Sequence, residues 1–170
     1  MLIDHFKPTY TAASAAFTPG ATPDDVFTIT GSATKIIYVV RMGISCTQTT
    51  AGLNSWFIRK RSTANSGGTS AAVAAVSHDG SNAAASATVL QYTADPTLGT
   101  PIGDVWSGWI NSPVVTTASI GEQGVVVPFW VPQGEPIILR GTGSVLSWCF
   151  NNAALPAGLS LHCYVTWYEL

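Results

Sequence analysis

Residues 159–169 alternate between apolar and polar or amphipathic side chains, and this alternation constrains the fold more than any other feature of the sequence. The period-2 spacing of an extended chain puts on one face Leu159, Leu161, Cys163, Val165 and Trp167. Such a pattern is typical of an antiparallel strand with one face on a core and the other toward solvent. The second face carries two tyrosines and a histidine, which suits a sheet surface that another molecule touches.

Similar short segments recur along the chain, at residues 26–30, 34–47, 53–61, 87–92, 103–110, 125–131, 136–140 and 144–151. No segment has convincing helical periodicity, although residues 71–76 could form one or two helical turns. About eight strands separated by Gly/Pro turns predict an all-β protein, an antiparallel β-sandwich. Eight strands of this size are common in a two-sheet jelly roll, which we expect here.

The segment 34–47 is the longest candidate strand. Its alternation predicts one shared face for Ile36, Tyr38, Val40, Met42, Ile44 and Cys46.

Residues 1–23 differ from the rest because prolines recur among Thr, Ala and Ser, and proline disfavours both helix and central strand. We expect an extended N-terminal arm at 1–23, a single sandwich domain at 24–170, and one long loop after residue 61. Phe6, Tyr10 and Phe17 would be poorly placed in water. They predict that the arm lies on this subunit or on a neighbour, and we expect them to anchor it at an interface.

The chain of 170 residues fits one domain, and only 9% of it is charged, against about 25% in an average soluble protein. A surface so poor in charge predicts burial in an assembly, with a neutral monomer surface as the alternative. The net charge of −2 gives no general footprint for nucleic acid. No apolar run approaches the roughly 18 residues that cross a membrane, so neither nucleic acid nor membrane is an expected partner.

The N-terminal eight residues lack a secretory signal pattern, so we expect synthesis in a cytoplasm. The three cysteines, Cys46, Cys149 and Cys163, are widely spaced in apolar contexts and read as reduced core residues.

A search for catalytic chemistry finds little. Asp24 and Asp25 are the only adjacent acids, and neighbours in a strand face opposite ways, so we expect turn or edge solvation there. None of the three histidines has a partner at metal-ligand spacing. We therefore expect no enzyme, no catalytic or metal residues and no cofactor.

Arg59, Lys60 and Arg61 hold three of the seven positive charges. Alternation puts Arg59 and Arg61 on one strand face and Lys60 on the other. Two readings stay open, a solvated strand end or an arginine pair that meets carboxylates across an interface.

Trp106 and Trp109 are separated by an odd number of residues, which puts them on opposite faces of a regular strand. One ring is then expected to be buried and the other exposed. An exposed ring could stack on a sugar, whereas the alternative is that both rings fill the core or a subunit contact.

The basic cluster also begins the segment in which the chain resembles a known family. Residues 57–70 read Phe57-Ile58-Arg59-Lys60-Arg61-Ser62-Thr63-Ala64-Asn65-Ser66-Gly67-Gly68-Thr69-Ser70, with a His78-Asp79 pair and Tyr92-Thr93-Ala94-Asp95-Pro96-Thr97-Leu98-Gly99 further on. This succession resembles a group of tailed-bacteriophage virion proteins. So do Ile137-Ile138-Leu139-Arg140-Gly141-Thr142 and the last strand, so the resemblance covers roughly residues 34–170. The chain departs from the group's pattern in having Asp95 in place of Asn and Gly80 in place of a polar residue.

The resemblance implies a jelly-roll structural protein of a phage particle, made in the host cytoplasm and located in the virion. The first expectation is a capsid decoration or cement protein that binds the major capsid protein as a homotrimer. The alternative is a tail or baseplate receptor-binding module that grips host glycans through Trp106 or Trp109.

Overall fold

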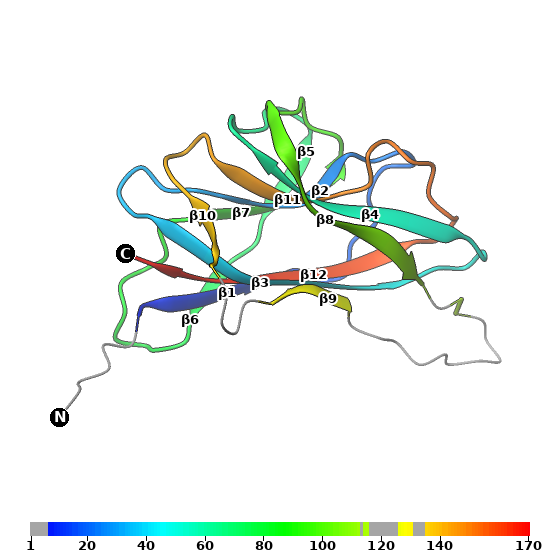
Figure 1. Cartoon of the computed structure of the whole chain (residues 1–170). Coiled ribbons are helices and arrows are strands. Elements are labelled where there is room, and N and C mark those ends of the chain that lie inside the picture. Colours follow the sequence, from blue (N-terminus) through cyan, green and yellow to red (C-terminus); the bar gives the residue numbers. More distant parts are fainter. Residues whose placement is uncertain (1–6, 113, 116–125, 131–134) are drawn as a thin grey trace.

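The computed structural model describes residues 7–112, 114–115, 126–130 and 135–170 (Figure 1). This part of the chain contains strands and no helix. The strands form two antiparallel six-stranded sheets that face each other as a β-sandwich, so the expected all-β class and sandwich are confirmed. The predicted helical turns at residues 71–76 are wrong, since strands occupy parts of that segment.

Sheet A is the lower layer in Figure 1. Its strands lie in the order β10 (Ile137–Leu139), β3 (Ile37–Thr47), β12 (Ser160–Glu169), β1 (Thr9–Ala13) and β6 (Ala75–Ser77), and β9 (Val126–Trp130) also pairs with β3. Sheet B is the upper layer, in the order β5 (Thr69–Ala72), β7 (Thr88–Ala94), β2 (Asp25–Thr30), β11 (Val145–Cys149), β4 (Leu53–Arg61) and β8 (Pro101–Asn111).

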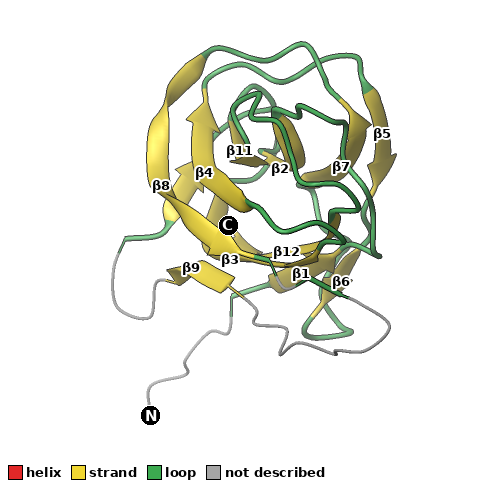
Figure 2. Ribbon diagram, turned by 90° about the vertical axis from the view of Figure 1, so that its right-hand side faces the viewer, coloured by secondary structure: helices red, strands yellow, loops and turns green. Residues whose placement is uncertain are grey.

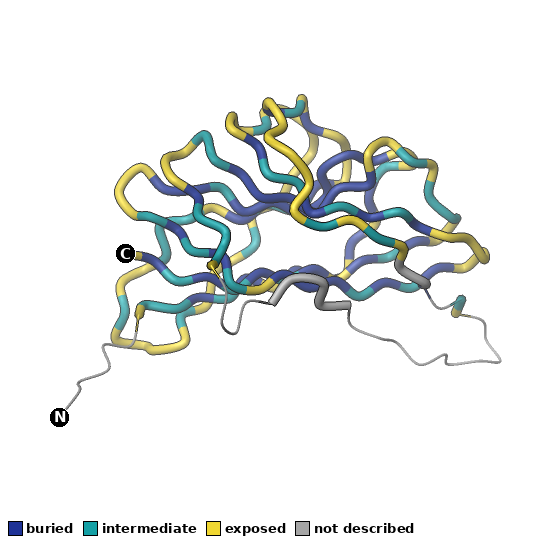
Figure 3. Tube along the Cα trace, in the orientation of Figure 1, coloured by how far each residue is buried: buried dark blue, intermediate teal, exposed yellow. Residues whose placement is uncertain are grey.

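The hydrophobic core lies between the two sheets, where the buried residues of both layers meet (Figure 3). On β12 the buried apolar positions are the predicted ones, Leu161, Cys163, Val165 and Trp167, and Glu169 is buried as well. Sheet B contributes large aromatic rings, with Trp56 and Trp148 edge to face at 6.1 Å between ring centroids. The alternation that predicted the last strand is therefore confirmed by its burial.

The N-terminal arm is part of the sandwich from residue 9 onward, which corrects the expected boundary between arm and domain. β1 pairs along its whole length with β12, and Phe17 bridges to Leu161. Tyr10 and Phe17 are 3% and 6% exposed and belong to the core of their own chain, where Tyr10 stacks on Trp167. These two residues are not free to anchor the chain on a neighbour. Phe6 lies outside the described residues.

A β-bulge in β3 corrects the predicted face of that strand. Thr166 pairs with Arg41 and Trp167 with Val39, so Val40 is skipped in the ladder. Beyond the bulge Met42, Ile44 and Cys46 are buried as expected, whereas before it the buried residues are Ile37 and Val39. A single inserted residue exchanges the two faces of a strand. This is why Tyr38 lies on the outer face.

The long loop after residue 61 contains two short strands and joins both sheets. β5 pairs with β7 in sheet B, and β6 pairs with β1 in sheet A. Together with β1, these two strands lie in segments expected to be an arm and a loop, and the described residues contain twelve strands in place of about eight. The loop thereby extends one side of the sandwich.

Candidate functional site

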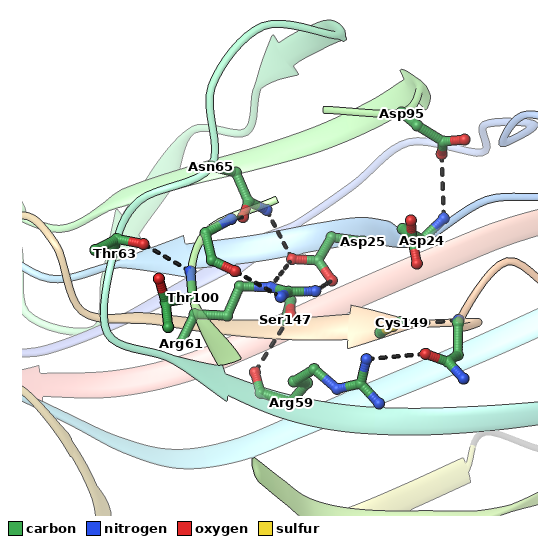
Figure 4. A network of polar contacts seen from close by, with 12 residues as sticks. Asp24, Asp25, Arg59, Arg61, Thr63, Asn65, Asp95, Thr100, Ser147 and Cys149 are labelled. Atoms are coloured by element: carbon green, nitrogen blue, oxygen red, sulfur yellow. Dashed lines mark hydrogen bonds and ion pairs between the residues drawn. The ribbon is translucent and has the colours of Figure 1, made fainter. Parts of the chain in front are cut away.

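The basic end of β4 lies on the outer face of sheet B. Trp56 and Ile58 point into the core, so alternation turns Arg59 and Arg61 to the opposite face. Ser147 and Cys149 on the neighbouring β11 share that face, because Leu146, Trp148 and Phe150 fill the core. Figure 4 shows the polar network that these residues form. The predicted common face of the two arginines is confirmed.

Arg61 forms a buried bidentate ion pair with Asp25. Its Nε and Nη2 donate to the two carboxylate oxygens of Asp25 at 2.8 Å each, and its Nη1 donates to the Gly99 carbonyl at 2.9 Å. The two side chains are 1% and 0% exposed. Burial lowers the pKa of Arg61, but the hydrogen bonds and the charge of Asp25 outweigh it and the pKa is raised. Asn65 completes the group by donating to Asp25 at 2.6 Å and accepting from the Gly99 N–H at 2.9 Å.

Asp25 reaches this face because of a second bulge. Phe27 is opposite Trp148 and Asp25 is opposite Cys149, so Val26 is the extra residue. Strict alternation would have placed Asp25 on the core face with Phe27. The bulge turns the carboxylate outward, toward Arg61.

Two loop segments cover the ion pair and hold each other. Ser66 and Thr97 exchange backbone hydrogen bonds of 2.7 and 3.0 Å, and the Thr63 hydroxyl accepts from the Thr100 N–H at 2.6 Å. We call this unit the clasp, meaning Asp25, Arg61, Asn65 and the backbone of residues 62–68 and 94–100. Glycine is required within it: Gly68 has φ +74°, and a Cβ there would lie 2.8 Å from the backbone of Asp95 and Pro96.

The clasp contains two polar segments with glycines, Ser62-Thr63-Ala64-Asn65-Ser66-Gly67-Gly68 and Ala94-Asp95-Pro96-Thr97-Leu98-Gly99. Each polar residue described above forms a hydrogen bond within the chain, and Gly68 allows the two segments to approach closely. These segments therefore cover the Asp25–Arg61 ion pair on the outer face of sheet B.

Arg59 forms a second, more exposed ion pair. Its Nε and Nη2 donate to Asp104 of β8 at 2.6 and 3.1 Å, and its Nη1 donates to Asn151 at 3.0 Å. The side chains of Arg59 and Asp104 are 16% and 32% exposed. Both arginines thus meet carboxylates of their own chain, so their described ion pairs lie within the chain and not across an interface.

Asp24 and Asp25 are buried at 8% and 0% exposure, which corrects the expectation of turn or edge solvation. The pKa of Asp24 is raised, first by burial and then by the neighbouring charges of Asp25 and Asp95. No local sequence signal pairs Asp25 with Arg61, which lies 36 positions away.

The two tryptophans of β8 do face opposite ways, as predicted. Trp106 packs edge to face on Trp148 at 6.0 Å between ring centroids, whereas Trp109 is 68% exposed. Trp109 lies opposite Ser55. Leu53, two residues from Ser55 on β4, and Val105, four residues from Trp109 on β8, are 69% and 44% exposed. We call Leu53, Val105 and Trp109 the open strip, since these apolar side chains are exposed.

The outer face of sheet A carries an aromatic row. Tyr38 and Tyr168 are stacked at 4.7 Å between ring centroids, with the Lys7 ammonium 4.3 Å from the Tyr168 ring. The Arg41 guanidinium lies 5.1 Å from the Tyr164 ring. The rings are partly covered by their own neighbours, which distinguishes this row from the open strip.

The three cysteines are free and buried, as expected. Burial raises the pKa of each thiol, for Cys149 to about 12. Thiols of this kind are protonated at neutral pH and poor nucleophiles.

Among the described residues no group of three or more His, Cys, Asp or Glu side chains is arranged to hold a metal ion. The same part of the chain has no helix able to cross a membrane.

Compared with protein-family models, curated proteins and solved structures, the chain matches none of them.

Proposed function

We propose that this protein is a structural component of a bacteriophage particle, and first of all a capsid decoration or cement protein. It would bind the major capsid protein on the outside of the shell as a homotrimer, be made in the host cytoplasm and act through contact alone, without a cofactor. The resemblance of residues 57–99 and of the last strand to phage virion proteins supports the class of protein. The open strip supports the mode of action.

We further propose that the sandwich is a jelly roll of eight principal strands. An eight-stranded jelly roll consists of two four-stranded sheets linked by Greek-key connections. The orders β10-β3-β12-β1 and β2-β11-β4-β8 support this assignment, because successive strands switch sheets from β1 to β4 and again from β10 to β12. On this assignment β5, β6 and β7 form an insertion between two jelly-roll strands, and β1 is a principal strand.

The single observation that carries the contact role is the unusual distribution of polar and apolar groups on sheet B. Arg61 and Asp25 are buried, while Leu53 and Trp109 are about two-thirds exposed. Exposed apolar clusters rimmed by polar residues mark interaction sites. Burial of aromatic anchors at an interface contributes most of its binding energy.

The test is the copy number of the protein in purified particles, measured by quantitative mass spectrometry against the major capsid protein. A decoration protein is expected in an amount comparable to the shell protein, and stripped shells should bind it again. A copy number that is a small fraction of the shell protein would contradict the decoration role and favour a tail position.

A second candidate is a tail or baseplate module that binds host glycans, and the exposure of Trp109 favours it. Aromatic rings free on one face can stack on sugars. Only Trp109 is available for this, because Trp106 packs on Trp148. Glycan-array binding that is abolished by Trp109→Ala and kept by Leu53→Ala would support this role over cementing, whereas an array without signal would reject it.

A further inference from the structure

The edge of sheet B at β8 has the properties of a strand-pairing site. β8 ends the order β5-β7-β2-β11-β4-β8, and the described residues place no strand beyond it. The opposite edge of the sandwich is extended by β5 and β6, which are short. β8 is eleven residues long and carries Ile102, Val105 and Trp109, all exposed. Natural proteins normally protect such an edge with charges, prolines, covering segments or β-bulges. β8 has bulges at Ile102 and Val105, and its ladder with β4 is regular from Trp106 to Asn111.

The charge on this edge is already neutralised within the chain. Asp104 is the one charged residue of β8, and it is bound by Arg59. Pro101 stands at the first position, where it leaves the rest of the strand free to pair. A strongly charged partner would find no opposite charge on β8, whereas a second copy of this chain would meet no repulsion.

The sequence Val105-Trp106-Ser107-Gly108-Trp109 is self-complementary about Ser107. In an antiparallel pair of two β8 strands centred on Ser107, Val105 of one copy lies opposite Trp109 of the other, on both sides of the axis. Trp106 is directed into its own core and Gly108 lies against it, so only the outward residues change their surroundings. Val105 is the extra residue of a bulge, so it has no partner on β4.

We propose that β8 pairs antiparallel with β8 of a second copy, so that two B sheets join into one continuous sheet across a twofold axis at Ser107. The contact is isologous and closes with two copies. It would place Val105 of each copy beside Trp109 of the other on the outer face of the joined sheet, and satisfy the outward backbone donors and acceptors of the edge. This inference goes beyond the proposed function, because it names a surface and a partner and does not require a shell. Any threefold contact would use another surface.

The register provides a direct test by cross-linking. Opposed residues of an antiparallel pair have Cα atoms about 4.5 or 5.5 Å apart, and a disulfide accepts Cα separations of about 4.4–6.8 Å. Ser107→Cys should therefore cross-link to a covalent dimer under mild oxidation. Ser70→Cys, an exposed position on the opposite edge strand β5, is the matched control and should remain monomeric. The three native cysteines are buried and do not interfere.

Sedimentation velocity on the purified full chain gives the second readout. The wild type should sediment as a dimer or a larger species, and Val105→Lys should weaken the β8 contact at least about tenfold, since edge lysines block strand pairing. Near-ultraviolet circular dichroism confirms that the variant is folded. A monomeric wild type, equal cross-linking at residues 107 and 70, or an oligomer unaffected by Val105→Lys would each overturn the proposal.

Discussion

The outer face of sheet B has two halves that reverse the usual distribution of residues. Over β2, β11 and the end of β4, the charged side chains of Asp25 and Arg61 are buried within the clasp. Over the start of β4 and β8, apolar side chains of the open strip face outward. Because charges seldom lie inside unless they are paired and large apolar clusters seldom lie outside, each half requires its own explanation.

This difference separates the residues that stabilise the fold from the residues that are exposed to another molecule. Every principal polar atom of the Asp25–Arg61 pair has a partner in its own chain, so the clasp has little left to offer another molecule. The open strip contributes little to the fold, because its side chains are exposed. The residues that look most functional in the sequence therefore maintain the fold, and the residues that look like core face outward.

The largest expected effect is that of Arg61→Ala. Removal of one partner leaves the Asp25 carboxylate buried and unpaired, which should lower the free energy of unfolding by about 3–5 kcal/mol. Equilibrium denaturation in urea measures it. Lys60→Ala is a control from the same cluster, because Lys60 donates a single hydrogen bond, to the Ile138 carbonyl. Equal effects of the two substitutions would contradict a special role for the clasp.

Two adjacent glycines separate backbone strain from packing in the clasp. Gly67 and Gly68 both have positive φ, but a Cβ at Gly67 meets nothing within 4 Å, whereas one at Gly68 meets the facing segment. Gly67→Ala should cost about 1–2 kcal/mol from the left-handed conformation alone. Gly68→Ala should cost about 1–3 kcal/mol more from overpacking. Thermal unfolding compares the two variants, and equal midpoints would contradict the additional packing cost at Gly68.

The lowered pKa of Glu169 predicts that the stability of the fold depends on pH without the involvement of an ion pair. Burial raises its pKa, but hydrogen bonds from Trp167, Ser86 and the Ala87 N–H outweigh burial and the pKa is lowered. A lowered carboxyl pKa stabilises the fold fully above its ordinary value of 4.5, and this contribution is lost as the pH falls through the lowered pKa. Glu169→Gln should unfold with less dependence on pH in that acidic range. Unfolding midpoints of both proteins as a function of pH check this, and parallel curves would contradict it.

The exposed ion pair should matter less than the buried one. Arg59→Ala is expected to cost about 1 kcal/mol, because solvent screens a pair that is partly exposed. The wild-type advantage should shrink in high salt, as measured by urea denaturation at two ionic strengths. A cost as large as that of Arg61→Ala would show that exposure does not separate the two pairs.

Trp109→Ser should have the smallest effect on folding, within about 0.5 kcal/mol, as for an exposed side chain without partners. Its effect should fall on association, which sedimentation velocity detects. Trp56→Ser is the contrasting variant, since Trp56 is fully buried and should fail to fold stably. A strongly destabilised Trp109→Ser would place that ring in the fold and contradict the division between the two halves.

The sequence was sufficient for the features that depend on local periodicity. The all-β class, the alternation of β12 and the opposite faces of Trp106 and Trp109 follow from a period of two residues. The faces before the bulges of β3 and β2 could not be predicted, because an inserted residue leaves no compositional mark. The partner of Arg61 could not be predicted either, since it is brought close only by the order of strands in sheet B.

The proposed contact role depends on long-range information of the same kind. The position of β8 at the end of sheet B leaves its edge without a neighbouring strand among the described residues, and this position could not be predicted from the apolar residues of β8.

A double-mutant cycle on Asp25 and Arg61 tests most directly whether the basic end of β4 stabilises the fold through a buried ion pair. It compares the free energies of unfolding of Asp25→Asn, Arg61→Met and the double variant. The account predicts that the two substitutions are strongly non-additive, with a coupling energy of about 2–3 kcal/mol, because each single change leaves a buried charge without its partner. Additive effects, within about 0.5 kcal/mol, would contradict the claim that the Asp25–Arg61 pair stabilises the clasp.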